Sequence, residues 1–568
     1  MTDSGTSFAA AQARASSLAE HLSELAARST ANRAHNIWIE RLSPDASLAM
    51  TAPDGPLAGL TFATKDNIDI AGVRTTAACP AYAYTAKTSA SAVARLISAG
   101  ATPLGKTNLD QFATGLVGAR SPYGACRNAR FPERISGGSS AGSAVAVALG
   151  EADFSLGTDT AGSGRVPAAF HGLVGMKPSR GLIPNAGVVP ACRSLDCVTT
   201  FTQTARDAAR LLDVMAGPDA NDPSSRELVP RWFSGPTRIG VPSVDALAFP
   251  DDAYGPAEFE SACNRLALLG YEVVPIDPAP FIAAGNLLYS GPWVAERTTA
   301  VGDFIRSQRE DTLEVTAAII SGGDGLSAVD TFQGFDALRE IALEANRILA
   351  SVDAILMPTV DRFPTIAEVE AEPVAVNTAL GRFTNFMNLL DYAAVAFPAS
   401  LAAGDLPFGV TLFAPAGSDR ALLEVASRFE GQDYAATRGF TLAAAGAHMS
   451  GLPLNWQLLE RGGRLLERTR TAPGYRLLAL PGGPPKRPAL VPEAGGSAQI
   501  EIELWDLPPE RIGDLLALVP APLAFGRLTA EDGRELTGFV GAAGAEAGAE
   551  DVTAFGSWRA YLEDGARP

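Results

Sequence analysis

The spacing of apolar residues along the first 430 positions predicts helices that alternate with short strands. Leucine, isoleucine and valine recur at helical spacing over residues 8–42, 89–100 and 200–216. Short apolar runs predict buried strands in LTFATKD, TPLGKT, PTRIGVP, GYEVVPI and VDAILMPTV. TNFMNLLDYAAVAFPAS and LPFGVTLFAP are expected as core elements near the end of the sheet. Helices that alternate with strands indicate an α/β fold in which helices surround a central mixed sheet.

The alternation of predicted helices and short strands changes between residues 431 and 446. Beyond this point, IEIELWDL alternates as a half-buried strand does, and residues 482–498 predict a loop rich in proline and glycine. We therefore expect two domains, one over 1–435 and a smaller, strand-rich α+β domain over 446–568. A chain of 568 residues is also too long for one ordinary core.

Cysteine usage and the N-terminal residues indicate a soluble, cytoplasmic protein. The N-terminus lacks the basic and then apolar order of a signal peptide, and no apolar run reaches the roughly 18 residues of a membrane span. The irregular spacing of the cysteines is typical of reduced thiols and not of a disulfide framework. The five cysteines are Cys79, Cys126, Cys192, Cys197 and Cys263.

Charge and motif content narrow the possible partners. The net charge of -18 argues against a nucleic-acid surface, and an anionic substrate would need particular cations in the site to overcome the overall repulsion. No GxxxxGK[ST] motif and no metal-ligand constellation occur, so we expect neither a cofactor nor a metal. With only four histidines in the chain, a serine nucleophile is expected to use a base of another kind.

The stretch from Ser136 to Arg165 holds two glycine-serine clusters around an apolar run. Glycines beside a serine let backbone N–H groups approach a reacting atom, as a nucleophile with an oxyanion hole requires. A flexible linker is the alternative, but AVAVAL and FSLGT are too apolar for a solvated spacer. Residues 166–190 are expected to form loops that close one side of the site, with His171 packed and hydrogen-bonded inside them.

Lys65 lies at the end of a predicted buried strand, before a turn at Asp66-Asn67. Phe62 and Ile68 make this an unusually apolar setting for an ammonium group. Burial disfavours the charged form of a lysine and lowers its pKa, so Lys65 is a candidate base.

Three motifs resemble the amidase signature family: ATKDNID around Lys65, GGSSAGS at 137–143 and GTDTAGSGR at 157–165. They occur in the family's order, with 74 residues from Lys65 to Ser139 and 24 from Ser139 to Ser163. The resemblance implies that Ser163 is the nucleophile, that Ser139 follows a cis peptide bond and relays the proton, and that Lys65 is the base. Ser140 would support them by hydrogen bonding. The implied oxyanion hole is formed by the backbone N–H groups of Thr160, Ala161, Gly162 and Ser163.

Further segments resemble the branch of this family that hydrolyses allophanate (urea-1-carboxylate). These are residues 107–124, 287–297, 446–458 and 471–482. The resemblance implies that Tyr289 and Arg297, in a loop that leads into a helix, bind the substrate carboxylate, for which a guanidinium fork is well suited. Arg120 and Ser121 are expected to contribute to the pocket.

The same resemblance implies a second step in the C-terminal domain. Release of ammonia from allophanate would leave N-carboxycarbamate, and a γ-glutamylcyclotransferase-like domain would promote its decarboxylation, with His448 as the candidate catalytic residue. A homodimer and a functional link to a urea carboxylase, within urea degradation and nitrogen metabolism, are the implied partners.

Two other functions remain open from the sequence. The first is a broader small-aliphatic or malonamate-type amidase. The second is an amidotransferase-like subunit whose C-terminal domain is a docking module. A self-contained enzyme is favoured because the chain contains all three proposed catalytic residues, Lys65, Ser139 and Ser163, and a second domain of its own.

Overall fold

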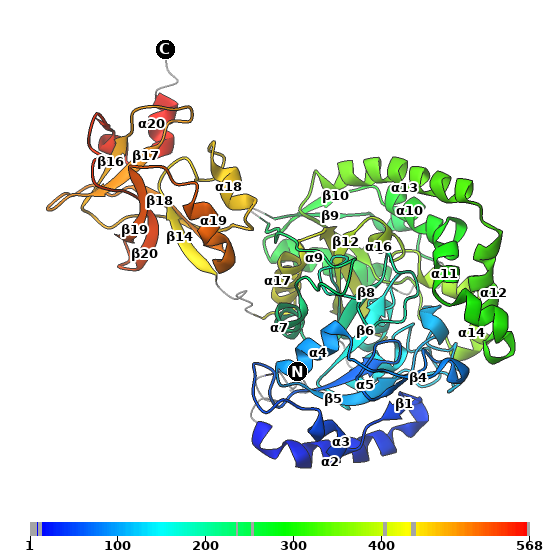
Figure 1. Cartoon of the computed structure of the whole chain (residues 1–568). Helices are drawn as coiled ribbons and strands as arrows, with labels where there is room; N and C mark the ends of the chain where they lie inside the picture. Colours follow the sequence, from blue (N-terminus) through cyan, green and yellow to red (C-terminus); the bar gives the residue numbers. More distant parts are fainter. Residues whose placement is uncertain are drawn as a thin grey trace. The chain divides into compact units, whose positions relative to one another are not determined.

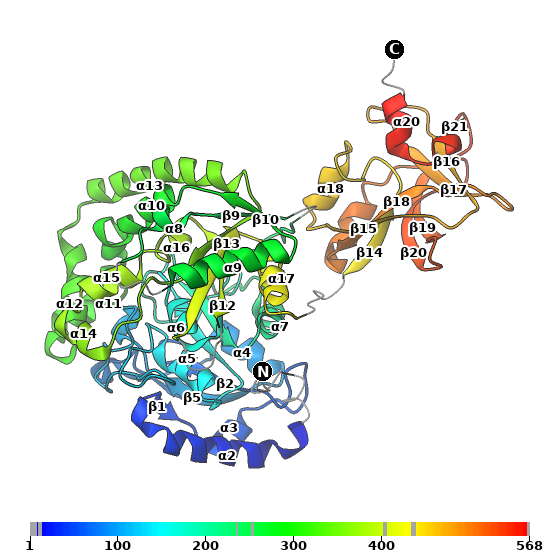
Figure 2. The same ribbon diagram turned by 180° about the vertical axis from the view of Figure 1, so that it is seen from behind.

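The chain folds into two compact units (Figures 1 and 2). The computed structural model describes residue 8 and residues 14–233, 237–250, 255–400, 406–432 and 439–564. The first unit comprises residues 1–228 and 236–434, and the second comprises residues 229–235 and 435–568. The expected domain end at residue 435 and the expected helix over 9–13 lie outside the described residues.

An eleven-stranded sheet forms the centre of the first unit. In spatial order its strands are β1 (Trp38–Arg41), β5 (Thr102–Thr107), β2 (Thr61–Lys65), β6 (Phe154–Asp159), β8 (Cys197–Thr202), β7 (Val174–Lys177), β12 (Tyr392–Ser400), β13 (Phe408–Pro415), β11 (Ala354–Pro358), β9 (Arg238–Val241) and β10 (Glu272–Pro275). β2 runs parallel to β5 and β6, whereas β12 and β13 are antiparallel. The sheet is therefore mixed, as predicted, and β2 and β6 bring Lys65 and the Ser163 loop to the same edge.

Helices cover this sheet on its two faces (Figures 1 and 2). They are α2 (Leu18–Ala31), α3 (Pro44–Ala49), α4 (Ser91–Ser98), α5 (Ala141–Ala148), α6 (Val166–His171), α7 (Ala205–Met215), α8 (Val244–Leu247), α9 (Pro256–Leu268), α10 (Ala279–Ser290), α11 (Trp293–Ser307), α12 (Glu314–Ser321), α13 (Ala328–Leu349), α14 (Ile366–Ala371), α15 (Ala375–Leu380), α16 (Phe386–Leu389) and α17 (Asp419–Phe429). A small hairpin of β3 (Arg74–Thr75) and β4 (Tyr84–Thr85) lies beside them. None of the helices in the described ranges combines the length and the apolar character needed to cross a membrane.

The apolar run between the two glycine-serine clusters forms helix α5, which is buried from Ala141 to Val147. Burial on all sides leaves no solvated spacer, so the linker alternative is wrong. Because α5 starts directly after Ser140, its position in the core also fixes the first glycine-serine cluster.

Several sequence predictions differ from the observed elements. Residues 38–41 form strand β1 and not a helix, because Asn36 adopts a left-handed conformation that ends the preceding helical turn. The expected loops over 166–190 contain helix α6 and strand β7, and residues 283–304 form helices α10 and α11 on either side of Gly291-Pro292. Strands β12 and β13 lie in the interior of the sheet and not near its end, with both faces of β12 buried up to Pro398.

The second unit is strand-rich and separate from the first, which confirms the predicted fold class. A five-stranded sheet contains β15 (Arg464–Arg470), β18 (Glu501–Leu507), β14 (Phe440–Ala444), β20 (Glu535–Gly541) and β19 (Leu523–Thr529). A three-stranded sheet contains β17 (Pro488–Pro492), β16 (Tyr475–Ala479) and β21 (Glu550–Asp551), and the helices are α18 (Asn455–Leu459), α19 (Ile512–Leu516) and α20 (Trp558–Asp564).

Two details of this unit differ from the sequence prediction. IEIELWDL, strand β18, is buried on both faces, because Leu504 and Trp505 enter two different core clusters. Residues 488–492, expected inside a loop, pair as strand β17 with β16.

A short segment from the middle of the chain also belongs to the second unit. The indole Nε1 of Trp232 donates a 3.0 Å hydrogen bond to the backbone oxygen of Gly462, and the guanidinium of Arg464 lies 5.1 Å from the centre of the indole ring. The second unit is therefore built from two stretches of sequence.

Candidate active site

Lys65 ends strand β2 with its side chain fully buried. Its Nζ is 2.7 Å from both Ser139 Oγ and Thr158 Oγ1. Burial lowers the pKa of Lys65 to about 7, although nearby carboxylates act in the opposite direction. A large fraction of this amine is therefore neutral near pH 7, and a neutral amine can accept a proton.

Ser139 connects Lys65 to the second glycine-serine cluster. Its Oγ donates a 2.9 Å hydrogen bond to Ser163 Oγ, so the three side chains form one continuous hydrogen-bonded row. The Gly138-Ser139 peptide bond is cis, as the family resemblance implies. The row offers a path for a proton from Ser163 through Ser139 to Lys65.

Only glycine fits at position 138. A Cβ there would lie 2.1 Å from Asp110 Oδ2 and 2.6 Å from the backbone nitrogen of Gly118. The Asp110 carboxylate accepts hydrogen bonds from the N–H groups of Val117 and Gly118, and the Asp110 N–H donates to the carbonyl of Ser139. Asp110, which the sequence reasoning missed, thus holds the loop that supports Ser139.

The loop that carries Ser163 is held by a buried ion pair. The Asp159 carboxylate accepts hydrogen bonds from the N–H groups of Gly162 and Gly164 and from the Arg165 guanidinium. Burial alone would raise the pKa of Asp159, but Arg165 and these hydrogen bonds hold it below its usual value. The sequence reasoning missed both residues, although the acid and the arginine stand in the same GTDTAGSGR motif.

Backbone N–H groups near Ser163 can stabilise an oxyanion. The N–H groups of Thr160, Ala161 and Ser163 donate to no other group in the described part of the chain. The N–H of Gly162, also expected in the oxyanion hole, donates to Asp159 Oδ1 at 3.0 Å. Three N–H donors therefore remain beside the Ser163 hydroxyl.

Arg297, on helix α11, is buried and makes no salt bridge to a described residue. Its side chain is 2% exposed, and its Nε and Nη1 atoms have no hydrogen-bond partner among the described residues. Its Cζ lies 5.5 Å from the centre of the Tyr289 ring, at the end of α10. A buried guanidinium without a partner is costly, so this arrangement is suited to bind an anion.

Asp196 connects the Arg297 region to the Ser163 loop. Its carboxylate accepts hydrogen bonds from the Thr160 hydroxyl and from the N–H of Ala191, and it interacts electrostatically with Arg297. Burial raises the pKa of Asp196 to about 6. Ala161 also packs in one core cluster with Trp293 of α11. Arg297 and Tyr289 therefore belong to the surroundings of the Ser163 loop.

The remaining candidates of the first unit have mainly structural contacts. Arg120 donates to the carbonyls of Thr114 and Pro373 and lines a pocket together with Tyr289. Ser121 donates to Asn108 Oδ1 within its own loop, and Ser140 donates to the Thr158 carbonyl. His171 is buried against the Pro167 carbonyl, and burial lowers its pKa to about 4.

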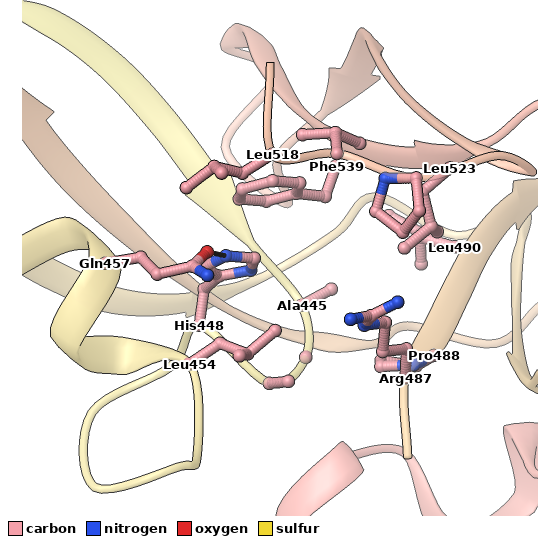
Figure 3. A pocket seen from close by; sticks show the side chains of 14 residues that line it. Ala445, His448, Leu454, Gln457, Arg487, Pro488, Leu490, Leu518, Leu523 and Phe539 are labelled. Carbon is pink, nitrogen blue, oxygen red and sulfur yellow. Dashed lines mark hydrogen bonds between the residues drawn. The ribbon is translucent and has the colours of Figure 1, made fainter. Parts of the chain in front are cut away.

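His448 belongs to the second unit, whereas the serine-lysine row belongs to the first. Its Nε2 lies 2.9 Å from Gln457 Oε1, and its ring stacks on Phe539 with 4.2 Å between the ring centres (Figure 3). Burial lowers the pKa of His448, so the neutral ring is favoured.

Comparison with known proteins identifies both parts of the chain. Residues 16–423 match the Amidase family model, and residues 440–563 match the model of the allophanate hydrolase C-terminal domain. The chain is 42% identical to urea amidolyase of Saccharomyces cerevisiae over 547 residues, which cover 89% of this chain and 30% of that protein. It thus spans less than a third of the length of this relative.

A solved structure extends the match to the fold. The allophanate hydrolase of Kluyveromyces lactis superposes with a TM-score of 0.72 at 37% identity, over 93% of each chain. One subunit of the glutamyl-tRNA(Gln) amidotransferase of Thermus thermophilus is 35% identical over 410 residues, 66% of this chain and 85% of that protein. These matches confirm the resemblance that the motifs indicate: the chain belongs to the amidase family, and it carries a second domain of the allophanate hydrolase C-terminal type.

Proposed function

We propose that the protein hydrolyses allophanate, with its first unit as the amidase. The buried, unpaired guanidinium of Arg297 carries this proposal, because a small anionic amide would supply the missing partner. An allophanate carboxylate bound there, beside Tyr289, leaves the amide end of the molecule for Ser163. The similarity to an allophanate hydrolase over 93% of both chains supports the same substrate.

In the proposed reaction Ser163 Oγ attacks the terminal amide carbonyl of allophanate. Its proton passes to Ser139, and the Ser139 proton passes to the neutral amine of Lys65. The N–H groups of Thr160, Ala161 and Ser163 stabilise the oxyanion. The intermediate collapses when the C–N bond breaks and the leaving nitrogen takes the proton back as ammonia.

Water completes the cycle through the same row. It gives its proton through Ser139 to Lys65 while its oxygen attacks the acyl-enzyme. The acyl C–O bond then breaks, and Lys65 returns the proton through Ser139 to Ser163 Oγ, which leaves as a hydroxyl. The product is N-carboxycarbamate, which holds two carboxylates on one nitrogen. Allophanate and one water thus yield one ammonia and this product.

We assign the second step to the C-terminal domain, with His448 as the candidate catalytic residue. Loss of one CO2 from N-carboxycarbamate breaks a C–N bond, and the nitrogen takes up a proton to give carbamate. Carbamate then takes up a second proton and divides into ammonia and CO2. The sum is two ammonia and two CO2 for each allophanate.

A urea-carboxylating activity is the proposed source of the substrate. The urea amidolyase relatives support this link by name, and this chain spans 30% of their length. We also propose that the protein is a homodimer. A cytoplasmic location is proposed because none of the five cysteines forms a disulfide. The amidotransferase alternative is less well supported, because that relative matches 66% of this chain whereas the allophanate hydrolase matches 93%.

Ammonia release from allophanate, urea, biuret, malonamate and acetamide tests the proposal in one assay. We expect turnover of allophanate to exceed turnover of the neutral amides. Arg297→Gln is expected to lower kcat/KM for allophanate by about 10² to 10³-fold, because it removes one partner of a buried charge pair. Turnover of acetamide, which has no carboxylate, is expected to change little.

Arg306→Gln is the matched control, since Arg306 lies on the same helix but is exposed and pairs with Asp303 and Asp324. It is expected to behave as the wild type. Equal losses on allophanate and acetamide in Arg297→Gln would contradict a carboxylate-binding role. Faster wild-type turnover of acetamide than of allophanate would favour the broader amidase.

The activity is expected to rise with pH through about 7. Lys65 accepts a proton only as the neutral amine, and its pKa is lowered to about 7 by burial. Below that pH the neutral fraction, and with it kcat/KM, should increase about tenfold for each pH unit, and above it kcat/KM should level off. A pH profile of kcat/KM for ammonia release measures this rise.

Asp196 titrates in a neighbouring range, since its pKa is raised to about 6. The variant Asp196→Asn keeps an acceptor for the Thr160 hydroxyl but does not titrate. The rise near pH 7 is expected to persist in it. Its disappearance in Asp196→Asn, or a flat wild-type profile, would contradict the assignment to Lys65.

A further inference from the structure

The second unit contains a pocket between the segment that follows strand β14, the start of β17 and the loop before β19 (Figure 3). His448 and Arg487 reach into it from opposite walls, and apolar side chains such as Leu490 and Phe539 form most of the rest. A second pocket adjoins it and shares Arg487, Pro520 and Leu523 as lining residues. Arg487 therefore stands where the two pockets meet.

The described lining of both pockets lacks negative charge. Among the described residues that line them, none carries a carboxylate, and Arg487 is the one permanently charged side chain. This is unusual in a chain with a net charge of -18. An anion that enters either pocket meets a local positive charge and no acidic neighbour in this lining.

The Arg487 guanidinium has no hydrogen-bonding or ionic partner in the part of the chain that the structure describes. Its Nε is buried without a hydrogen bond, and no ion pair joins it to any described residue. The backbone at this position is held in place, because the N–H of Leu480 donates to the Arg487 carbonyl at the base of the β16–β17 hairpin. A half-buried guanidinium with unused donors, on a backbone that is held in place, is suited to bind a planar carboxylate.

His448, on the wall opposite Arg487, adds no second positive charge to the pocket. Its ring is held by Gln457 and by stacking on Phe539, and burial together with the nearby Arg487 and Arg461 lowers its pKa and keeps it neutral near pH 7. The positive charge of the pocket is therefore supplied by Arg487, while His448 offers a neutral hydrogen-bonding ring on the opposite wall.

We propose that this pocket binds small dicarboxylate anions, and that Arg487 is the residue that binds one of their carboxylates. The inference deepens the proposed function and rests on it for the natural ligand, which would be N-carboxycarbamate. Arg487 then selects the dianion released by the first unit over neutral amides, and orients it against His448.

Malonate is a suitable probe, because a CH2 group replaces the nitrogen between its two carboxylates and it does not react. The dissociation constant of malonate is measured by titration calorimetry on the full chain. Every protein in the series carries Arg297→Gln, so that malonate does not bind at the anion site proposed for the first unit. Adding Arg487→Gln is expected to weaken malonate binding about 10 to 100-fold. Arg487→Lys, which keeps the charge but loses the planar fork, is expected to lie between the two.

Lys486→Gln is the control, because this neighbouring cation lies over Tyr561 and lines neither pocket. It should leave malonate binding unchanged, and the uncharged malonamide should bind weakly to all variants. Malonate binding that is unaffected by Arg487→Gln, or weakened equally by Lys486→Gln, would overturn the proposal. Circular dichroism of each variant verifies that the second unit is folded.

The outcome separates this inference from the proposed function. Malonate binding does not require Ser163 chemistry, so it can succeed even where ammonia release from allophanate fails. Conversely, a protein that releases ammonia from allophanate but binds malonate independently of Arg487 retains the amidase function and loses this site.

Discussion

Replacing Ser163 with alanine is expected to lower ammonia release from allophanate by about 10⁴-fold or more. The change removes the proposed nucleophile, and no other hydroxyl in the row can take its place, because Ser139 Oγ is committed to Lys65 and the Ser163 side. Ser163 is 3% exposed and its Oγ is linked to the row through Ser139, so the loss of one oxygen should leave the fold intact. Steady-state ammonia release measures the effect.

Ser307→Ala is the matched control for this substitution. Ser307 ends helix α11, is exposed, and donates to backbone carbonyls of its own helix. Its variant should retain wild-type turnover. Wild-type-like ammonia release by Ser163→Ala would rule out the acyl-enzyme mechanism, whatever the control shows.

Lys65→Ala is expected to cost about 10³-fold in kcat/KM, within the usual contribution of a positioned base. The substitution deletes the group that accepts the Ser163 proton and also leaves a cavity at the end of β2. Added methylamine can enter that cavity as a neutral amine, and we expect it to restore part of the activity in proportion to its unprotonated form. Ammonia release with and without methylamine measures both effects.

Lys87→Ala controls for the loss of a lysine, since Lys87 is exposed. It is expected to be fully active and insensitive to methylamine. Turnover of Lys65→Ala at the wild-type rate would contradict a base at this position. A melting temperature close to that of the wild type would show that lost activity in Lys65→Ala does not reflect unfolding.

The residues of the serine-lysine row carry local features in the sequence that made them candidates, and the resemblance to the amidase signature family assigned their roles. Lys65 ends an apolar strand, and Ser139 and Ser163 stand among glycines that leave room for backbone N–H groups. The residues that hold them were not predictable from the same signs. Asp110 and Asp196 act through carboxylates that accept from backbone N–H groups five to eight residues away in irregular loops, and such contacts leave no periodic pattern in the sequence.

In the fold, too, elements set by local periodicity were predicted correctly, whereas elements set by contacts with distant residues were not. The buried strand β2 and the helix-strand pair α4–β5 follow from local periodicity. Strand β1 was expected within a helix, although Ile37 and Ile39 are two residues apart, as in a strand. The left-handed Asn36 and the pairing with β5 end the helical pattern there. The burial of β18 on both faces likewise depends on two core clusters formed by distant residues.

The place of Trp232 has a practical consequence for exchanging domains between relatives. A chain cut once before Phe440 separates Trp232 from the Gly462 carbonyl and the Arg464 guanidinium that contact it. Neither fragment then contains the whole second unit. A chimaeric enzyme that keeps the second unit native therefore has to take both of its segments, residues 229–235 and 435–568, from the same parent protein.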